Sequence, residues 1–135
     1  MPQTVIHVPG VLAYERFGFT NCVRWGDTLY LSGISALDTT GGVVGADDIA
    51  AQTVKTYENI GAVLAAAGSS LDRIVQMTSF IVDLARNGRT YVEARRRILT
   101  SPTYTSAVIG VSALMIPGLL LEVQCIAVVD ERGGA

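Results

Sequence analysis

Glu122 is the residue of this sequence that points most directly to chemistry. It lies in LLLEVQCIAVV (residues 119–129), the most apolar segment of the chain. A carboxylate in such a segment must be paired, hydrogen-bonded or protonated, because an isolated buried charge is very costly. Such a group can serve as a general acid or base, or hold a water molecule. The alternative is that strand alternation points Glu122 outward or into an ion pair at an interface.

Two short polar segments could line a ligand site. Ser32 and Gly33 close an expected strand, where a hydroxyl and unpaired backbone groups can meet a ligand; the alternative is an ordinary turn. Three consecutive hydroxyl residues could line a polar pocket or simply begin a strand, namely Tyr104, Thr105 and Ser106. No histidine or lysine is near them in the sequence, so we do not expect a nucleophilic triad.

Metal and cofactor chemistry find little support in the sequence. His7 is the one histidine, and the two cysteines, Cys22 and Cys125, form neither a disulfide framework nor a metal-binding pattern. The glycine-rich residues 38–46 lack both the lysine and the spacing of phosphate-binding loops. We therefore expect no metal and no cofactor.

Arg95, Arg96 and Arg97 follow one another in an expected helix. Successive helical residues point about 100° apart, so the three cannot form one narrow stripe. We expect a solvated helix face, or ion pairs to a neighbouring subunit. Nucleic acid is not an expected partner, because no aromatic residues are interleaved with these arginines and the net charge is −2.

Apolar periodicity and turn signals predict the elements that position these residues. Helices are expected from Asp47 or Asp48 to Gly68 and over residues 88–99. Strands are expected over residues 4–8, 21–25, 28–32, 74–82, 105–113 and 119–129. Hairpins mixed with crossover helices predict an α+β fold in which two helices pack on one face of a mixed sheet.

Composition favours one domain over residues 1–135 and an oligomer. Half of the residues are hydrophobic and 16% are charged, which excludes a disordered chain. A chain of this length buries about two-thirds of its unfolded surface, so we expect the apolar excess to lie at a subunit interface. No stretch of eighteen apolar residues and no signal peptide is visible, and we expect a cytoplasmic protein without membrane contact.

Three segments of the sequence resemble the YjgF/RidA family, once called L-PSP endoribonucleases. They are GDTLYLSG (26–33), DIAAQTVKTYENIGAVLAAAGSSLDRIVQMTSFIVDL (48–84) and PGLLLEVQCIAVV (117–129). The resemblance extends over residues 17–129. It implies a chorismate-mutase-like α+β fold and a homotrimer, with a central barrel and ligand clefts between subunits. It also implies hydrolysis of reactive enamines or imines to ammonia and a keto acid, without metal or cofactor.

The resemblance implies a role for several residues. Glu122 matches the family's cleft glutamate, which positions the hydrolytic water, and Ser32 and Gly33 match a serine–glycine pair that lines the cleft. Phe19 stands where a tyrosine is common, and Ile34 where a glutamine is common. The expected ligand-contacting residues beside the catalytic Glu122 are Phe19, Ser32, Gly33, Ile34, Tyr91, Thr105 and Ser106.

The sequence departs from the family at its carboxylate-binding arginine. In the best-known members this arginine lies in a P-A-R-[ST] segment, whereas this chain has PTYTS at residues 102–106. Counting from Pro102 places Tyr104 at the arginine position, and counting back from Gly110 places Ser106 there. No arginine occurs between Arg97 and Arg132. The chain therefore resembles the arginine-lacking branches, and we expect a less anionic, or a larger and more apolar, substrate.

Three functions follow as hypotheses. The first is hydrolysis of a small reactive imine or enamine, with Glu122 as the catalytic residue. The second is a non-catalytic protein that binds or senses a small metabolite, which the missing arginine favours and Glu122 opposes. The third, ribonuclease activity, is disfavoured by the sequence pI of 5.2 and by the lack of a histidine pair.

Overall fold

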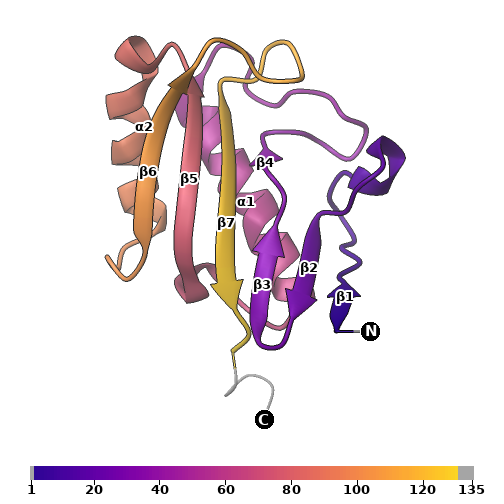
Figure 1. The fold of residues 1–135 in the computed structure, drawn as a ribbon. Helices are drawn as coiled ribbons and strands as arrows, with labels where there is room; N and C mark the ends of the chain where they lie inside the picture. The colour runs from indigo at the N-terminus through magenta and orange to yellow at the C-terminus, as the bar shows by residue number, and fades with distance from the viewer. Residues whose placement is uncertain (1, 131–135) are drawn as a thin grey trace.

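The computed structural model describes residues 2–130 (Figure 1). The elements follow in the order β–β–β–β–α–β–α–β–β, so the predicted order is confirmed apart from one short additional strand. Their bounds are β1 (Gln3–Val5), β2 (Cys22–Trp25), β3 (Thr28–Leu31), β4 (Ile34–Ser35), α1 (Ile49–Ala66), β5 (Ile74–Val82), α2 (Leu84–Ile98), β6 (Thr105–Val111) and β7 (Leu121–Val128). Two short 3₁₀ turns, η1 (Tyr14–Phe17) and η2 (Leu71–Arg73), complete the set.

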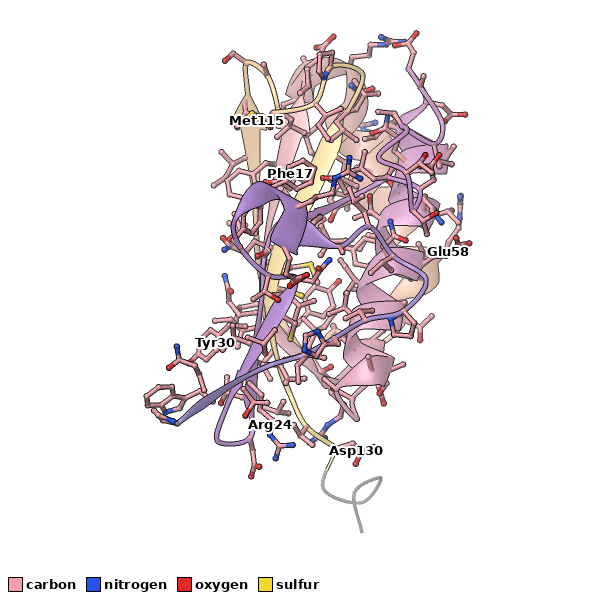
Figure 2. The ribbon with its side chains drawn as sticks, turned by 90° about the vertical axis from the view of Figure 1, so that its right-hand side faces the viewer. Phe17, Arg24, Tyr30, Glu58, Met115 and Asp130 are labelled. Carbon is pink, nitrogen blue, oxygen red and sulfur yellow. The ribbon has the colours of Figure 1, made fainter. Side chains whose placement is uncertain are left out.

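The strands form one mixed sheet with the helices on one face. Its order is β1-β2-β3-β7-β5-β6, and β4 pairs with β7 beside β3. The β5–β6 pair is parallel, and helix α2 makes the crossover between these strands, whereas the other pairs are antiparallel. The two views at right angles show both helices behind the same face (Figures 1 and 2). The structure therefore has the expected α+β fold.

Local sequence signals explain where the helices begin and end. The Asp48 carboxylate accepts a hydrogen bond from the backbone N–H of Ala51, so Asp48 caps helix α1 and Asp47 does not. Gly68 follows the end of this helix with φ +76°, a conformation that glycine adopts without strain. Helix α2 begins four residues earlier than predicted, because Asp83 caps it from a left-handed conformation with φ 55°. Periodicity alone gives no sign of that conformation.

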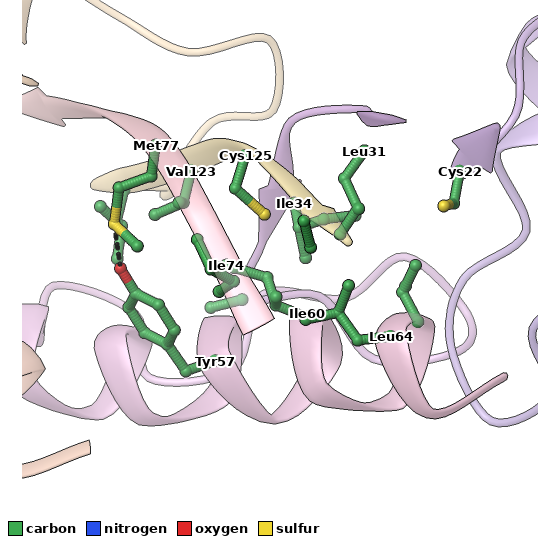
Figure 3. Packing of buried hydrophobic residues seen from close by; sticks show 14 of the residues in the cluster. Cys22, Leu31, Ile34, Tyr57, Ile60, Leu64, Ile74, Met77, Val123 and Cys125 are labelled. Carbon is green, nitrogen blue, oxygen red and sulfur yellow. Dashed lines mark hydrogen bonds between the residues drawn. The ribbon is translucent and has the colours of Figure 1, made fainter. Parts of the chain in front are cut away.

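The core lies between the sheet and the helices, and strand β7 shows why. Leu121, Val123, Cys125 and Ala127 are all buried, whereas the residues between them point to the opposite face of the sheet. Residues of α1 meet this row from the other side (Figure 3). The period of two along β7 therefore sends Glu122 to the face that carries no helix.

That open face of the sheet is rich in apolar side chains. Trp25 is 52% exposed, Tyr30 49% and Ile109 43%. Figure 2 shows Tyr30 projecting on the side away from the helices. A surface of this kind is what the apolar composition predicts for a subunit interface. Neither helix in residues 2–130 combines the length and the hydropathy that a membrane span requires.

Candidate functional site

Glu122 is placed by strand pairing in the middle of the sheet. In the register of β7 it stands opposite Ser35 of β4 on one side and Phe80 of β5 on the other. The Ser35 hydroxyl donates to Glu122 Oε1 at 3.5 Å. The carboxylate is half-buried, and no cation forms an ion pair with it among residues 2–130. The structure therefore presents an acid that is partly removed from water and has no counter-ion.

Gly33 makes room for this carboxylate. A Cβ atom added at Gly33 would lie 2.5 Å from both Cδ and Oε2 of Glu122, far inside the contact distance. The acid therefore lies directly against the backbone at Gly33. Because a side chain at this position would occupy the space of the acid, the structure explains why the chain has glycine there without invoking an unusual backbone conformation.

Tyr14 of η1 is a site residue that the sequence reasoning missed. Its hydroxyl donates to the Gly33 carbonyl oxygen at 2.8 Å, and its backbone N–H donates to the Asn21 side chain. The ring of Phe19 packs against the Tyr14 ring, with centroids 5.2 Å apart. The sequence indicates only a mixed aromatic loop at residues 11–19, and nothing in it shows that this loop folds back over the strand containing Gly33.

Burial changes the pKa values of Glu122 and Tyr14. Removal from water raises the pKa of Glu122, and the hydrogen bond from Ser35 lowers it by less. Burial also raises the pKa of Tyr14 to about 12, with a further contribution from the negative charge of Glu122. The phenol therefore stays neutral as a donor. A carboxyl group whose pKa is raised by burial holds a proton more readily than a fully solvated glutamate, and this favours a role in proton transfer.

The structure gathers some of the predicted site residues around Glu122 and leaves others apart. Gly33 touches the acid and Phe19 packs against Tyr14, while the Ser32 hydroxyl donates to the Thr20 carbonyl at 2.6 Å. Ile34 is 3% exposed, because its side chain points toward the helices. Tyr91 is fully buried in helix α2. Ligands cannot reach these last two side chains in the protomer.

Tyr91 belongs instead to a buried chain of hydroxyl groups. Its hydroxyl is 2.7 Å from that of Tyr57 and also contacts the Ser79 hydroxyl. The Tyr57 hydroxyl donates to the sulfur of Met77 (Figure 3). These hydrogen bonds tie both helices to strand β5, so the structure gives Tyr91 a packing role.

Thr105 and Ser106 lie at the start of β6, two strands away from Glu122. The Thr105 hydroxyl donates weakly to the Val75 carbonyl at 3.4 Å. Ser106 accepts a hydrogen bond of 2.7 Å from Nη1 of Arg95. Neither residue meets Glu122 within one protomer, so their part in a common site would require a second subunit.

Arg95 departs from the expectation for the three consecutive arginines. Arg96 and Arg97 are exposed as expected, but Arg95 is only 8% exposed. Its guanidinium lies over the rings of Tyr91 and Tyr104, at 5.2 and 5.6 Å from their centroids. The prediction of a solvated face is therefore wrong for Arg95, because its position on α2 faces strands β5 and β6. Arg95 also contacts both residues that counting placed at the family's arginine position.

The described residues offer no metal centre. Among residues 2–130, no three histidine, cysteine, aspartate or glutamate side chains gather closely enough to hold an ion. Cys22 and Cys125 are buried free thiols, and burial raises their pKa to about 11 and about 12. Such thiols are protonated at neutral pH and act as packing groups.

Comparison with known proteins places the chain among a well-populated set of relatives. The family model described as endoribonuclease L-PSP matches residues 13–129. The chain is 28% identical over 120 residues to RutC family protein YjgH of Escherichia coli, with 88% of each protein covered. It is 35% identical over 103 residues to protein DfrA of Myxococcus xanthus, covering 76% of this chain and 77% of that one.

The fold agrees with solved structures over nearly the whole chain. The crystal structure of RidA from the Antarctic bacterium Psychrobacter sp. PAMC 21119 matches with a TM-score of 0.84 and 27% identity, covering 93% of this chain and 99% of that one. The likeness therefore extends over nearly the whole fold.

Proposed function

The chain belongs to the YjgF/RidA family, described as endoribonuclease L-PSP, and from this premise we propose that it hydrolyses a small reactive imine or enamine. The observation that carries the proposal is the environment of Glu122. Its carboxylate is half-buried without a counter-ion, it lies against Gly33, and burial raises its pKa. This is the environment that a general acid–base residue requires near neutral pH.

The proposed reaction needs no group besides water and one acid–base residue. Ionised Glu122 accepts a proton from water while the water oxygen forms a bond to the carbon of the protonated imine, which gives a neutral carbinolamine. Glu122 then returns this proton to the amine nitrogen, the C–N bond breaks and ammonia leaves, and the hydroxyl proton passes to Glu122 or to water as the carbonyl product forms. An enamine first takes a proton on carbon from protonated Glu122 and so becomes the protonated imine. The backbone at Gly33 and the Ser32 oxygen are proposed to orient the substrate.

The proposal includes a homotrimer with clefts between subunits. The apolar open face of the sheet, with Trp25, Tyr30 and Ile109 exposed, supports an interface there. In such an assembly Thr105 and Ser106 of one subunit are proposed to hydrogen-bond a polar group of the substrate held by Glu122 of the next. Light scattering coupled to size-exclusion chromatography tests this part, and a monomer would contradict it.

The direct test is ammonia release by the purified protein. 2-Aminoacrylate, generated in the assay, and the ring-cleavage enamine 2-aminomuconate are the substrates to compare with the uncatalysed rate. We expect acceleration by the wild type and none by Glu122→Ala. Equal rates for the two proteins would end the catalytic role of Glu122.

A non-catalytic binding protein is the second candidate, and the segment at residues 102–106 favours it. This segment contains no arginine, so the contact that fixes a substrate carboxylate in the best-known relatives is missing from β6. The discriminating result is a rise in melting temperature with metabolites of the imine and enamine panel in the absence of turnover.

A further inference from the structure

The guanidinium of Arg95 is a buried cation whose hydrogen-bonding capacity is largely unused. Of its five N–H donors, those on Nη1 meet Ser106 at 2.7 Å and the sulfur of Met77 at 3.6 Å. Nε is buried and has no hydrogen-bond partner. No carboxylate forms an ion pair with Arg95 among the described residues. Residues 2–130 therefore place no acceptor on the side of the group formed by Nε and Nη2.

The contacts that Arg95 does make cannot replace an anion. The two tyrosine rings lie against the guanidinium as cation–π partners, Tyr91 at 5.2 Å and Tyr104 at 5.6 Å. Ring faces offer no acceptor for N–H groups that lie in the guanidinium plane. Arginine also cannot lose its charge by deprotonation, as a buried lysine can. Its position in the last turn of α2 places it near the partial negative charge of the helix end, which offsets part of the cost of burial.

Arg95 lies close to the surface of the protomer. Arg95 donates a hydrogen bond to Ser106, which is exposed. Ser106 belongs to β6, an edge strand whose outer side pairs with no described strand. Arg95 itself keeps 8% of its surface exposed. The guanidinium therefore lies just beneath the surface at the edge of the sheet, between this edge and helix α2.

We propose that Arg95 is an anion-binding residue that takes one small oxyanion, a carboxylate or a phosphate, on its Nε–Nη2 side. This side matches two oxygens of such a group with two parallel hydrogen bonds. Carboxylates and phosphates share this chemistry, and the experiment below separates them.

This site is separate from Glu122 within one protomer. Ser106 of β6 pairs with Met77 of β5, which in turn pairs with Cys125 of β7. The Arg95 site is therefore two strands away from β7, and Cys125, the residue of β7 level with Ser106, is three residues from Glu122. With about 4.8 Å between strands and about 3.3 Å per residue, the separation is on the order of 14 Å. The two side chains also lie on opposite faces of the sheet. The inference therefore does not depend on the proposed hydrolysis.

The test measures melting temperature in Tris chloride against sodium acetate, sodium phosphate and sodium chloride at equal ionic strength. For the wild type we expect acetate or phosphate to raise the melting temperature by about 3 °C or more at ten times its dissociation constant, beyond the chloride control. A rise with acetate assigns a carboxylate ligand, and a rise with phosphate alone assigns a phosphate. No rise beyond chloride with either salt would overturn the proposal.

Arg95→Met is the matched variant, because methionine keeps much of the volume and removes the charge. We expect it to lose the anion-dependent rise and, without added anion, to melt no lower than the wild type, since an uncompensated buried charge is gone. Arg89→Met, at an exposed position of the same helix, is the control that keeps the rise. A rise that persists in Arg95→Met would show that the anion does not bind at Arg95. A lower melting temperature for this variant, with no anion effect in the wild type, would show that Arg95 has only a structural role. Either result contradicts the proposal.

A measurement on the unaltered protein covers the case in which Arg95→Met fails to fold. The Nε–H signal of Arg95 in an NMR spectrum, assigned through Arg95→Lys, is expected to move with added phosphate or acetate and to stay in place with chloride. A signal that does not respond to either oxyanion contradicts the proposal.

Discussion

Glu122 and Arg95 are two ionisable side chains that the fold removes from water without an opposite charge. Glu122 is half-buried on the open face of the sheet, and Arg95 is nine-tenths buried between the sheet and α2. Among residues 2–130 neither forms an ion pair, and the ion pairs that do form, Arg24–Asp27 and Arg86–Asp47, are exposed. Among the described residues, neither Glu122 nor Arg95 therefore has a counter-ion.

The two residues differ in how they can relieve this cost. Glu122 can take up a proton, and burial raises its pKa. An arginine side chain has no such route, because the guanidinium group keeps its charge in proteins. An acid without a partner is therefore a candidate for proton transfer, whereas an arginine without a partner is a candidate for anion binding. The same shortage of counter-ions suits the two positions for different chemistry.

Glu122→Gln gives the largest effect expected from this comparison. Glutamine keeps the shape and the contact with Ser35 but cannot transfer a proton. We expect ammonia release to fall by about 10²–10⁴-fold, which is the usual contribution of general acid–base catalysis. Glu58→Gln on the exposed side of α1 is the control and should keep full activity. If ammonia release fell by a comparable factor in both variants, the loss could not be assigned to the carboxyl group of Glu122.

Gly33→Ala tests whether the position of the Glu122 carboxylate matters as much as its charge. The added Cβ would meet Cδ and Oε2 at 2.5 Å, so the acid must move. We expect a loss of activity on the order of 100-fold, because displacements of about 1 Å in an active site have effects of this size. Gly61→Ala is the matched control, since its nearest contact is an ordinary 3.8 Å to Leu71. Full activity of Gly33→Ala would contradict a fixed acid.

The element order and the glutamate could be predicted because their signals are local. Every second residue from 121 to 127 is buried, which defines the core-facing side of β7. Glu122 lies on the opposite side of the strand. Residue type alone places the start of α1 at Asp47 or Asp48 and its end before Gly68, and the structure selects Asp48 as the cap. The two-residue strand β4 was missed because so short a segment carries no periodicity, although it brings Ser35 to Glu122.

Long-range contacts could not be predicted from the sequence. Tyr14 reaches Gly33 across 19 residues, and Arg95 meets Ser106 across 11, through a turn whose path no pattern specifies. A run of three arginines predicts a solvated surface. The sequence does not indicate which of the three points inward, because the packing of α2 against the sheet decides this. The arginine that reaches β6 is Arg95, which belongs to the neighbouring helix α2, so no motif within β6 indicates it.

Tyr91→Phe separates the packing role of Tyr91 from its contact with Arg95. The variant keeps the ring beside the guanidinium and loses the hydrogen bonds to Tyr57 and Ser79. We expect the free energy of unfolding in urea to fall by about 2 kcal/mol, at roughly 1 kcal/mol per buried hydrogen bond. The anion-dependent rise in melting temperature should persist. Tyr30→Phe, on the open face, is the control, and equal stability of the two variants would contradict the structural role of the buried hydroxyls.

The smallest expected effect is a pH-dependent difference in melting temperature between Glu122→Gln and the wild type. Because the folded-state pKa of Glu122 is raised above the unfolded value of about 4.3, the folded protein binds its proton more tightly. This contribution to stability is fully present below the unfolded pKa and is lost as pH rises through the folded one. The variant should therefore match the wild type near pH 4 and melt higher at pH 7 to 8. The difference should not exceed a few degrees, because the half-exposed group is screened by solvent. A difference that stays constant from pH 4 to pH 8 would contradict the raised pKa. Because arginine side chains in general keep their charge over this range, we expect the difference in melting temperature between Arg95→Met and the wild type to be constant with pH in the absence of anions. The two variants therefore distinguish the buried acid from the buried arginine.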